Sequence, residues 1–553
     1  MVKDIFTYIV GGEAGEGVKK AGSVAARFFS KLGKQIFQRD DYMSLIRGGH
    51  NYSVVSASNR PINSHYNKAE LIVNSDERSY KKHINKLSEN GLIVYNSDKQ
   101  EGVEGIGVPF SSKAKGYKFK DLMYGVGAFA VLASATGQSK DRLNEIIKEE
   151  FPENSWDDNI SYAFEIFDIV DPEIGGRFKI EKGDKKRPIL TGNELISLGA
   201  IAGGLDCYFA YPMTPATSIL HFLAKYKKKF NLAVVQPENE ISVINMAIGS
   251  SFTGARTMIA SSGGGYALMS EGYSLAGMCE APLLIILTSR PSPASGVPTY
   301  TEQADLQFAL NTGHGDFLRI VASPGSISEA FYLTSELMDL TWRFQTPATL
   351  LTSKFLSESH MTVDLDLERT KWPDPKMHTG DGEYKRYLDT DDGISPLKFP
   401  PSEQLIKWNS YEHDELGITT EDPELTAKMH EKRHRKLNTL REHMKSLKTV
   451  NTFGDSGPLV FTWGSTTMSV LEAIEYGRID AKVVQPIYLR PFPDWEFEKY
   501  RNESIISVEL NKSGQFTELL KDKTGIKVKT LINQYNGRPF DPIELSKKLK
   551  EVL

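Results

Sequence analysis

The stretch "NLAVVQPENEISVINMAIGSSFTGARTMIASS", residues 231–262, determines how the centre of this chain folds. It begins with a short apolar segment, continues with apolar residues at helical spacing, and ends in a second apolar run, "RTMIASS". A strand, a helix and a strand in this order are typical of a βαβ unit, whose two strands are parallel. The stretch therefore predicts an open α/β sheet.

The same alternation of strands and helices occurs in three segments of the 553-residue chain. We expect α/β domains at residues 1–185, 186–360 and 451–553, which agrees with a length that suggests about three or four domains. Residues 361–450 lie between the last two. They combine a segment rich in proline, aspartate and glycine with one long charged helix, and we interpret them as a linker or ordered excursion.

Composition excludes several classes of protein. The formal net charge of -5 argues against a nucleic-acid-binding protein. No apolar run reaches the roughly 18–20 residues that span a bilayer, and the amino-terminal residues do not resemble a signal peptide. The only cysteines are Cys207 and Cys279, which excludes a disulfide framework and a cysteine-ligated zinc or iron–sulfur site in this chain. We therefore expect a cytoplasmic protein without a metal site of its own.

The segment "FAYPMTPATSI", residues 209–219, should leave the sheet abruptly, because Pro215 lacks the N–H group that a strand or helix interior needs. The residue before a proline favours extended backbone, so Thr214 should present its hydroxyl at the carboxyl end of a strand. Open α/β sheets bind ligands there. A turn in which Thr217 or Ser218 caps the next helix explains the same residues without a ligand.

Two glutamates, Glu238 and Glu240, stand where a strand gives way to a helix. Simple helix capping explains them, because carboxylates are stabilised at helix amino-termini. The alternative is a buried carboxylate that accepts a proton from the ring nitrogen of a heterocycle.

The loop "SRPSPASGVPTYTEQADL", residues 289–306, follows the apolar strand "APLLIIL" and contains Arg290, which is suited to bidentate binding of a carboxylate. It is the fourth loop to follow a predicted strand of one sheet. Because the carboxyl ends of parallel strands share an edge, we expect the four loops to converge on a site. These loops comprise residues 209–219, 236–240, 261–265 and 289–303.

The amino-terminal segment contains "GGEAGEG", residues 11–17, between a strand and a helix. Such a turn can present backbone N–H groups to an anion, and Gly15 and Gly17 are the candidates for cofactor contact. Arg47, in "SLIRGGHNYSV", is a candidate for the same site. The spacing does not fit the dinucleotide-binding motif, so a tight turn and an ordinary loop arginine remain alternatives.

Several motifs together resemble the 2-oxoacid:ferredoxin oxidoreductases. "YPMTPATS" is similar to the "YPITPSS" loop of that family, and "SRPSPASGVPTYTEQADL" is similar to its arginine loop. The run "ENEISVINMAIGSSFTGARTMIASSGGGYALMSE" and the carboxy-terminal "WGSTTMSVLEAI" and "VELNKSGQ" also match. "GGEAGEG" and "IRGG" resemble the separate gamma subunit. The resemblance therefore covers nearly the whole chain and implies an alpha subunit with a fused gamma domain.

This resemblance implies a gamma-like open sheet, a pyrimidine-binding-type domain of a thiamine enzyme, and a transketolase C-terminal-like domain. It implies that Glu238 bonds to the aminopyrimidine of thiamine diphosphate, with Glu240 the less favoured candidate. Thr214 and Arg290 would bind the keto-acid end of a 2-oxoacid, with Tyr211 and Thr299 assisting. The gamma-like domain would help to hold coenzyme A.

The resemblance also implies an active site shared with a beta subunit, in an alpha–beta heterodimer or its dimer. The beta subunit would hold the thiamine diphosphate phosphates, Mg²⁺ and a 4Fe-4S cluster, and electrons would pass to ferredoxin. This chain departs from the family pattern at Ala216 and Thr217, where serines are usual, at Ser295, and at Tyr300, where Lys or Arg is common. "SGPG" has become "SGGG". The loss of a positive charge at Tyr300 argues against an acidic side chain on the 2-oxoacid.

Two other functions fit the motifs. One is a different thiamine-dependent enzyme, such as a transketolase or a 2-oxoacid dehydrogenase component, which would need no iron–sulfur cluster. The other is a non-catalytic scaffold subunit that has kept the fold, against which Thr214, Glu238 and Arg290 argue.

Overall fold

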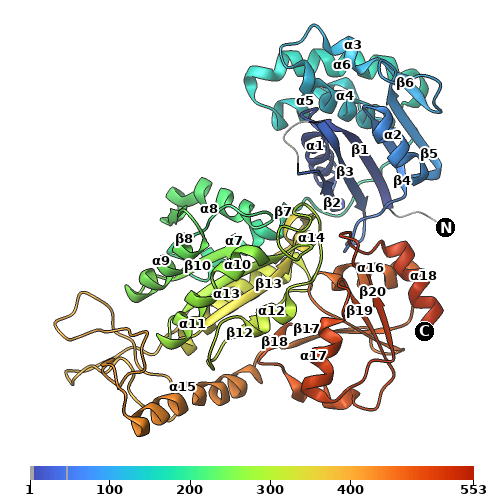
Figure 1. The fold of residues 1–553 in the computed structure, drawn as a ribbon. Helices are drawn as coiled ribbons and strands as arrows, with labels where there is room; N and C mark the ends of the chain where they lie inside the picture. Colours follow the sequence, from blue (N-terminus) through green and yellow to red (C-terminus); the bar gives the residue numbers. More distant parts are fainter. Residues whose placement is uncertain (1–4, 45–47) are drawn as a thin grey trace. The chain divides into compact units, whose positions relative to one another are not determined.

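The computed structural model describes residues 5–44 and 48–553, and in it the chain forms two compact units (Figure 1). Unit 1 comprises the residues up to Leu190 together with Glu358–Asp364 and Asp541–Ile543. Unit 2 comprises Thr191–Ser357, Leu365–Phe540 and Glu544–Leu553.

Unit 1 is built on an eight-stranded mixed sheet with the order β6-β5-β4-β1-β3-β2-β14-β7. Strand β1 is parallel to β4 but antiparallel to β3, and β2 is antiparallel to β3. The predicted βαβ alternation therefore holds for only part of this sheet. The strands are β1 (Ile5–Ala14), β2 (Gln35–Asp41), β3 (Gly48–Ser58), β4 (Ala69–Asn74), β5 (Leu87–Asn96), β6 (Ile106–Val108), β7 (Ile189–Thr191) and β14 (His360–Thr362).

The helices of unit 1 bury a core of aliphatic and aromatic side chains against this sheet. Helix α1 packs on β2 and β3, and α4 packs on both α1 and α6. The helices are α1 (Val18–Lys31), α2 (Glu77–His83), α3 (Phe110–Ala114), α4 (Lys120–Ala135), α5 (Lys140–Glu150) and α6 (Trp156–Ile174).

The larger sheet of unit 2 has seven strands in the order β18-β12-β13-β11-β10-β8-β9. All neighbours are parallel except β12 and β18. Every residue of β10, β11 and β13 is buried, as expected for parallel strands covered on both faces. The strands are β8 (Cys207–Phe209), β9 (Ala233–Val235), β10 (Thr257–Ser261), β11 (Leu283–Ser289), β12 (Ile320–Ala322), β13 (Pro347–Ser353) and β18 (Tyr488–Arg490).

Helices cover both faces of this sheet, because right-handed crossovers in opposite directions along it place their helices on opposite faces. Helix α7 contacts both α8 and α13, and α9 contacts α10 and α11. The bounds are α7 (Gly192–Ala202), α8 (Thr217–Phe230), α9 (Glu240–Phe252), α10 (Gly263–Leu268), α11 (Ser270–Met278), α12 (Leu306–Asn311), α13 (Ile327–Phe344) and α14 (Lys354–Glu358).

A five-stranded sheet, ordered β15-β17-β16-β19-β20, forms the carboxy-terminal part of unit 2. Its strand β17 is followed at once by β18, which joins the seven-stranded sheet, so both sheets share one hydrophobic core. Because residues on both sides of the predicted boundaries at 360 and 450 belong to the same compact unit, these boundaries stay predictions. The elements are β15 (Val450–Phe453), β16 (Leu459–Thr462), α16 (Thr466–Gly477), β17 (Lys482–Pro486), β19 (Ile505–Glu509), α17 (Gln515–Thr524), β20 (Thr530–Asn533) and α18 (Pro542–Val552).

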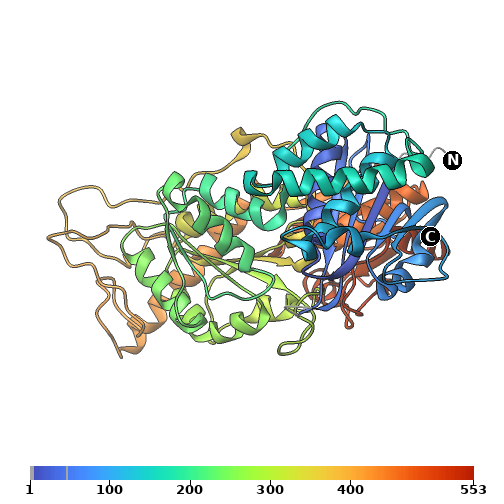
Figure 2. The same cartoon turned by 90° about the horizontal axis from the view of Figure 1, so that it is seen from above.

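The expected excursion, residues 361–420, precedes helix α15 (Pro423–Met444). Its first residues, up to Asp364, belong to unit 1, and the rest lies with α15 at one end of unit 2 in both views (Figures 1 and 2). A buried carboxylate fixes α15. Glu280 contacts the amino group of Lys432 at 2.7 Å and also that of Lys436. Burial lowers the pKa of Lys432 to about 7, although Glu280 opposes this shift. Over the described ranges, 5–44 and 48–553, no helix is long and apolar enough to cross a membrane.

Candidate active site

The turn between β8 and α8 carries Thr214. Helix α8 begins at Thr217, and its N-cap is Ala216, which makes no side-chain capping bond. The interpretation that Thr217 or Ser218 caps this helix is therefore wrong. An alanine at the N-cap leaves the turn to be held from elsewhere.

A buried asparagine in α7 holds this turn. The Asn193 side-chain amide donates to the Pro215 carbonyl at 2.9 Å and to the Ser218 hydroxyl at 2.7 Å. The turn leaves Thr214 half-buried, whereas Tyr211 is 39% exposed. Helix α7 itself begins after the N-cap Thr191, which forms a capping box with Glu194.

The arginine loop meets the threonine turn directly. The Nη1 group of Arg290 donates to the Thr214 carbonyl at 2.7 Å. The expected convergence of loops 209–219 and 289–303 is therefore confirmed. Because Arg290 is half-buried, its pKa is lowered by desolvation, and the carboxylate of Asp305 partly offsets this.

Asp305 closes the base of the same loop. Its carboxylate accepts a hydrogen bond from the Ser289 hydroxyl at 2.7 Å, which joins the first and last residues of the loop. Burial raises the pKa of Asp305, while the Ser289 hydroxyl and the Arg290 guanidinium act in the opposite direction. Thr299 is buried in this loop at 5% exposure.

The two candidate glutamates have different environments. Glu238 is exposed, and it precedes the N-cap residue Asn239. Glu240 is the first residue of α9 and only 2% exposed, with Oε1 3.3 Å from the Ser261 hydroxyl. Ser261 is the last residue of β10 and the first of the third predicted loop, so Glu240 contacts that loop.

A glycine makes room for the buried glutamate. A Cβ atom at Gly265 would lie 2.3 Å from Glu240 Oε1 and 2.1 Å from Ser261 Oγ. Sequence reasoning included residues 261–265 among the converging loops but named neither Ser261 nor Gly265. The run "SSGGGY" after an apolar strand was the available signal, because a glycine at close approach often admits a neighbouring group.

Unit 1 holds the remaining candidates. Gly15 and Gly17 have left-handed φ angles of 102° and 78°, and Gly17 is the N-cap of α1. A Cβ at Gly15 would meet open space, whereas Gly17 lies against the backbone of Gly125 in α4. Both the tight-turn and the cofactor interpretations therefore remain. Arg47 lies outside the described residues.

Buried polar groups lie next to Gly11 and Gly12, the first two residues of the glycine-rich segment 11–17. Within the described residues, both side-chain amide atoms of Asn74 and the hydroxyl of Ser75 are buried without hydrogen-bond partners. A Cβ at Gly12 would lie 2.6 Å from the Ser75 hydroxyl oxygen, and one at Gly11 would lie 3.3 Å from Asn74 Oδ1. The sequence did not identify these two residues.

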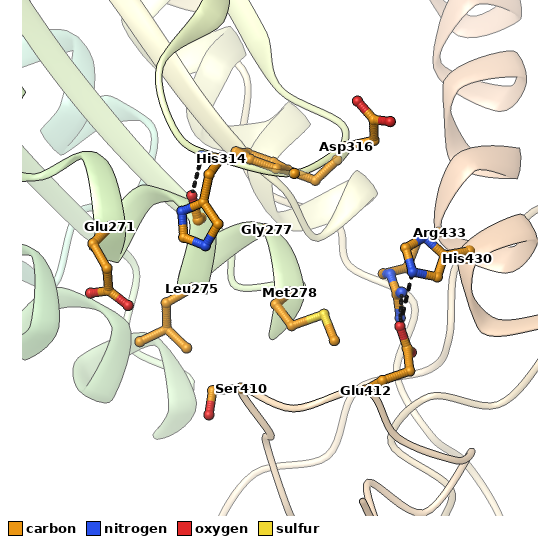
Figure 3. A pocket seen from close by; sticks show the side chains of 13 residues that line it. Glu271, Leu275, Gly277, Met278, His314, Asp316, Ser410, Glu412, His430 and Arg433 are labelled. Atoms are coloured by element: carbon orange, nitrogen blue, oxygen red, sulfur yellow. Dashed lines mark hydrogen bonds and ion pairs between the residues drawn. The ribbon is translucent and has the colours of Figure 1, made fainter. Parts of the chain in front are cut away.

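A separate cavity of about 250 Å³ lies between α11, the loop before β12 and α15 (Figure 3). Three of its side chains form a polar cluster: Arg433 donates to both carboxylate oxygens of Glu412, at 2.8 and 2.6 Å, and His430 Nε2 lies 3.1 Å from the same carboxylate. These bonds tie the excursion to α15. None of the predicted site residues lines this cavity.

Family models match two parts of the chain. "Pyruvate ferredoxin/flavodoxin oxidoreductase" matches residues 7–168, and "Pyruvate flavodoxin/ferredoxin oxidoreductase, thiamine diP-bdg" matches residues 198–432. The second match contains all four loops of the convergent edge.

Individual proteins match over greater lengths. The 2-oxoacid:ferredoxin oxidoreductase subunit alpha of Saccharolobus solfataricus is 30% identical, with 99% of this chain and 98% of that protein covered. The 2-oxoglutarate synthase subunit KorA of Archaeoglobus fulgidus is 28% identical over 58% of this chain and 88% of its own length.

A solved structure confirms the α/β fold. The 2-oxoglutarate:ferredoxin oxidoreductase from Magnetococcus marinus, determined with 2-oxoglutarate, coenzyme A and succinyl-CoA bound, superimposes with a TM-score of 0.90 at 28% identity, covering 99% of both chains. The resemblance drawn from the sequence motifs is thereby confirmed. This chain belongs to the 2-oxoacid:ferredoxin oxidoreductase family and corresponds to its alpha subunit, with a thiamine diphosphate-binding domain.

Proposed function

We propose that this chain, together with a beta subunit, catalyses the coenzyme A-dependent oxidative decarboxylation of a 2-oxoacid and passes the electrons to ferredoxin. The observation that carries the proposal is the meeting of Thr214, Arg290 and Glu240 at one edge of the seven-stranded sheet. Sequence separations of up to 76 residues between bonded partners indicate a site assembled by the fold and not by local turns.

Arg290 and Thr214 would bind the 2-oxoacid. The Thr214 carbonyl holds one edge of the guanidinium, and the other edge would take the substrate carboxylate, for which its planar donors are suited. Tyr211, exposed at the rim, and Thr299, buried in the arginine loop, would assist. Partial burial strengthens the interaction of the guanidinium with an anion, because less water competes for it.

Glu240 would contact the aminopyrimidine of thiamine diphosphate. The geometry fits this group: the carboxylate is buried at a helix amino-terminus, and the absence of a side chain at Gly265 makes room for it there. When bound, the thiazolium ring supplies the electron sink that allows a 2-oxoacid to lose CO₂. Glu240 would hold and return a proton at the ring nitrogen N1′. The role predicted for Glu238 stays untested, and its exposure favours Glu240.

A beta subunit would cover the same edge. Three apolar side chains beside Glu240 are exposed, Ile241 and Met246 on α9 and Leu268 on α10, each more than 40% accessible. Isolated exposed apolar residues are ordinary, but a group beside a proposed site is typical of an interface. The partner would hold the diphosphate, Mg²⁺ and a 4Fe-4S cluster. Among the residues that the structure describes, no group of three or more His, Cys, Asp or Glu side chains could hold a metal ion.

Unit 1 would contribute to coenzyme A binding. The turn at Gly15 and Gly17 presents the amino-terminus of α1, and the unpartnered side chains of Asn74 and Ser75 lie next to Gly11 and Gly12, at the start of the same glycine-rich segment. Backbone N–H groups and polar side chains of this kind suit a phosphate or pantetheine amide. The cytoplasmic location and the alpha–beta heterodimer, or its dimer, remain proposals made from the sequence.

Co-expression with a candidate beta subunit tests the proposed function. We expect the purified complex, with thiamine diphosphate and cluster bound, to reduce ferredoxin or a viologen only when a 2-oxoacid and coenzyme A are both present. The chain alone is the control and should be inactive. Decarboxylation without cluster-dependent reduction would indicate another thiamine enzyme, and a loaded complex inactive with every 2-oxoacid would indicate a scaffold subunit.

A further inference from the structure

The loop that carries Arg290 is held mainly by a different part of the chain. Its exposed portion, residues 293–297, is here called the loop tip, and its buried portion, residues 299–305, the loop base. The loop base lies against the carboxyl ends of β16, β19 and β20, through Trp463, Leu510 and Gly537. In open α/β sheets that edge is the usual place for a ligand.

Gln303 makes the central contacts. It is 2% exposed, and its side-chain amide nitrogen donates to the Trp463 carbonyl at 2.8 Å. Its amide oxygen accepts from the Leu510 N–H at 3.2 Å and from the Thr466 hydroxyl. The Gln303 N–H donates to the Leu510 carbonyl at 2.8 Å. A buried amide with these partners is costly to disturb, because each lost bond leaves a buried polar atom unpaired.

The shape of the sheet edge fits this side chain. Gly464, between β16 and α16, has a φ of 52°, and a Cβ there would lie 2.8 Å from the Gln303 amide nitrogen. The turn before α16 therefore approaches Gln303 as closely as such turns approach bound ligands. The carboxyl edge of the five-stranded sheet therefore contacts a glutamine from a loop of the seven-stranded sheet.

Further bonds hold the residues on both sides of Gln303. The Thr301 N–H donates to the Gly537 carbonyl at 3.2 Å, and the Gln515 side-chain amide donates to the Ala304 carbonyl at 2.8 Å. The Arg538 guanidinium lies 3.5 Å from the centre of the Tyr300 ring. Stacking of this kind adds a modest attraction.

The loop tip has no such support. Val297 N–H bonds to the Pro291 carbonyl within the loop itself, and residues 293–297 are exposed. The geometry of Arg290 and Thr299 therefore depends on the anchored loop base, since small displacements of substrate-binding groups have large effects on turnover.

We propose that the five-stranded sheet serves to hold the substrate loop in its binding conformation, and that Gln303 is the positioning residue through which it acts. The inference rests on the proposed substrate role of Arg290 and Thr299. Gln303 is buried and its side-chain amide bonds to Trp463, Leu510 and Thr466, so in this proposal it acts through the loop, and its effect should fall on substrate affinity and loop order.

The test compares Gln303→Met with Gln485→Met in the complex with the beta subunit. Both glutamines are buried and bonded between segments, but the bonds of Gln485 run to Ser323, Glu329 and Asn451, which lie outside residues 289–305. For Gln303→Met we expect the KM for the 2-oxoacid to rise about tenfold with the KM for coenzyme A unchanged. Gln485→Met should lower the melting temperature but leave both KM values near those of wild type.

A second measurement does not depend on turnover. Amide hydrogen exchange at the loop tip should accelerate in Gln303→Met and not in Gln485→Met. If Gln303→Met does not assemble, Thr466→Val removes a single bond to Gln303 and should raise the 2-oxoacid KM roughly threefold. Wild-type KM and wild-type exchange in the Gln303 or Thr466 variant would overturn the inference. An inactive wild-type complex would instead contradict the proposed function, and exchange at the loop tip would still decide the role of Gln303.

Discussion

Unit 2 contains two sheets of mainly parallel strands. The carboxyl ends of the parallel strands form one edge in each sheet, and the two edges differ in what covers them. The carboxyl ends of β8 to β11 present an exposed Tyr211 and loop tip around the buried Glu240. The carboxyl ends of β16, β19 and β20 are filled by the loop base, whose Gln303 is 2% exposed. The carboxyl edge of the five-stranded sheet is thus occupied by the protein itself, and in our proposal it orders the active-site loop of the seven-stranded sheet.

The largest expected effect is at the open edge, in Glu240→Gln. The change keeps the size of the side chain but removes its capacity to exchange a proton, so kcat should fall about a hundredfold or more. Steady-state assay of the complex measures this, with a melting curve to verify assembly. Glu238→Gln is the matched control and should retain near-normal turnover. If the Glu238 variant is the inactive one, the original assignment from the sequence holds.

Gly265→Ala tests whether the open edge needs the space beside Glu240. The added Cβ would lie 2.3 Å from the Glu240 carboxylate, so the side chain must move, and we expect kcat to fall about tenfold. Gly264→Ala is in the same first turn of α10 and has no atom within 4 Å of its Cβ. Its turnover should match wild type. Equal losses in both variants would indicate an effect on the helix and not on Glu240.

Gly296→Ala separates the loop tip from the loop base. Gly296 has a φ of 51°, and its Cβ would lie 1.7 Å from the Pro291 carbonyl oxygen, so the loop tip must rearrange. Because the base stays anchored, we expect only a moderate rise in 2-oxoacid KM, roughly threefold to tenfold. Gly315→Ala is the control. Gly315 has a φ of 74° but no atom within 4 Å of its Cβ, so the substitution strains the backbone without a steric clash. A wild-type KM in Gly296→Ala would show that the tip takes no part in binding.

The smallest effect concerns the pH dependence of stability at Asp305. Burial raises its folded-state pKa, so the folded state binds this proton more tightly than the unfolded state does, and wild-type stability falls as pH rises through that range. Asp305→Asn removes the free-energy cost of burying the charged carboxylate. Its melting temperature should exceed that of wild type more at pH near 7 than at pH near 4. The exposed Asp455→Asn is the control, and an unchanged difference across pH would contradict the prediction.

Part of this architecture was predictable from local pattern. The apolar runs of β10, β11 and β13 indicate strands buried on both faces, and their parallel order places four loops at one edge. The burial of Glu240 was also predictable from the sequence. It lies at the start of the stripe formed by Val243, Ile244 and Ala247, at helical spacing, whereas Glu238 precedes the helix.

The rest depends on contacts between distant segments. The antiparallel half of the unit 1 sheet arises from strands that look like the parallel ones, because alternation and apolarity do not specify direction. The three-residue strand β14 pairs with β2 more than 300 residues away. No local signal at Gln303 identifies its partners, because the residue type alone does not indicate whether a glutamine is buried or exposed.

The position of the loop base has a consequence for biosynthesis. Gln303 is bonded to Trp463, 160 residues later in the chain, and to Leu510, 207 residues later. At a translation rate of roughly 5–20 residues per second, the partners of Gln303 emerge from the ribosome about 10–40 s after it. A nascent chain that already contains every proposed substrate-binding residue of unit 2 therefore still lacks an ordered arginine loop. The catalytic edge becomes complete only when synthesis of the last sheet is almost finished.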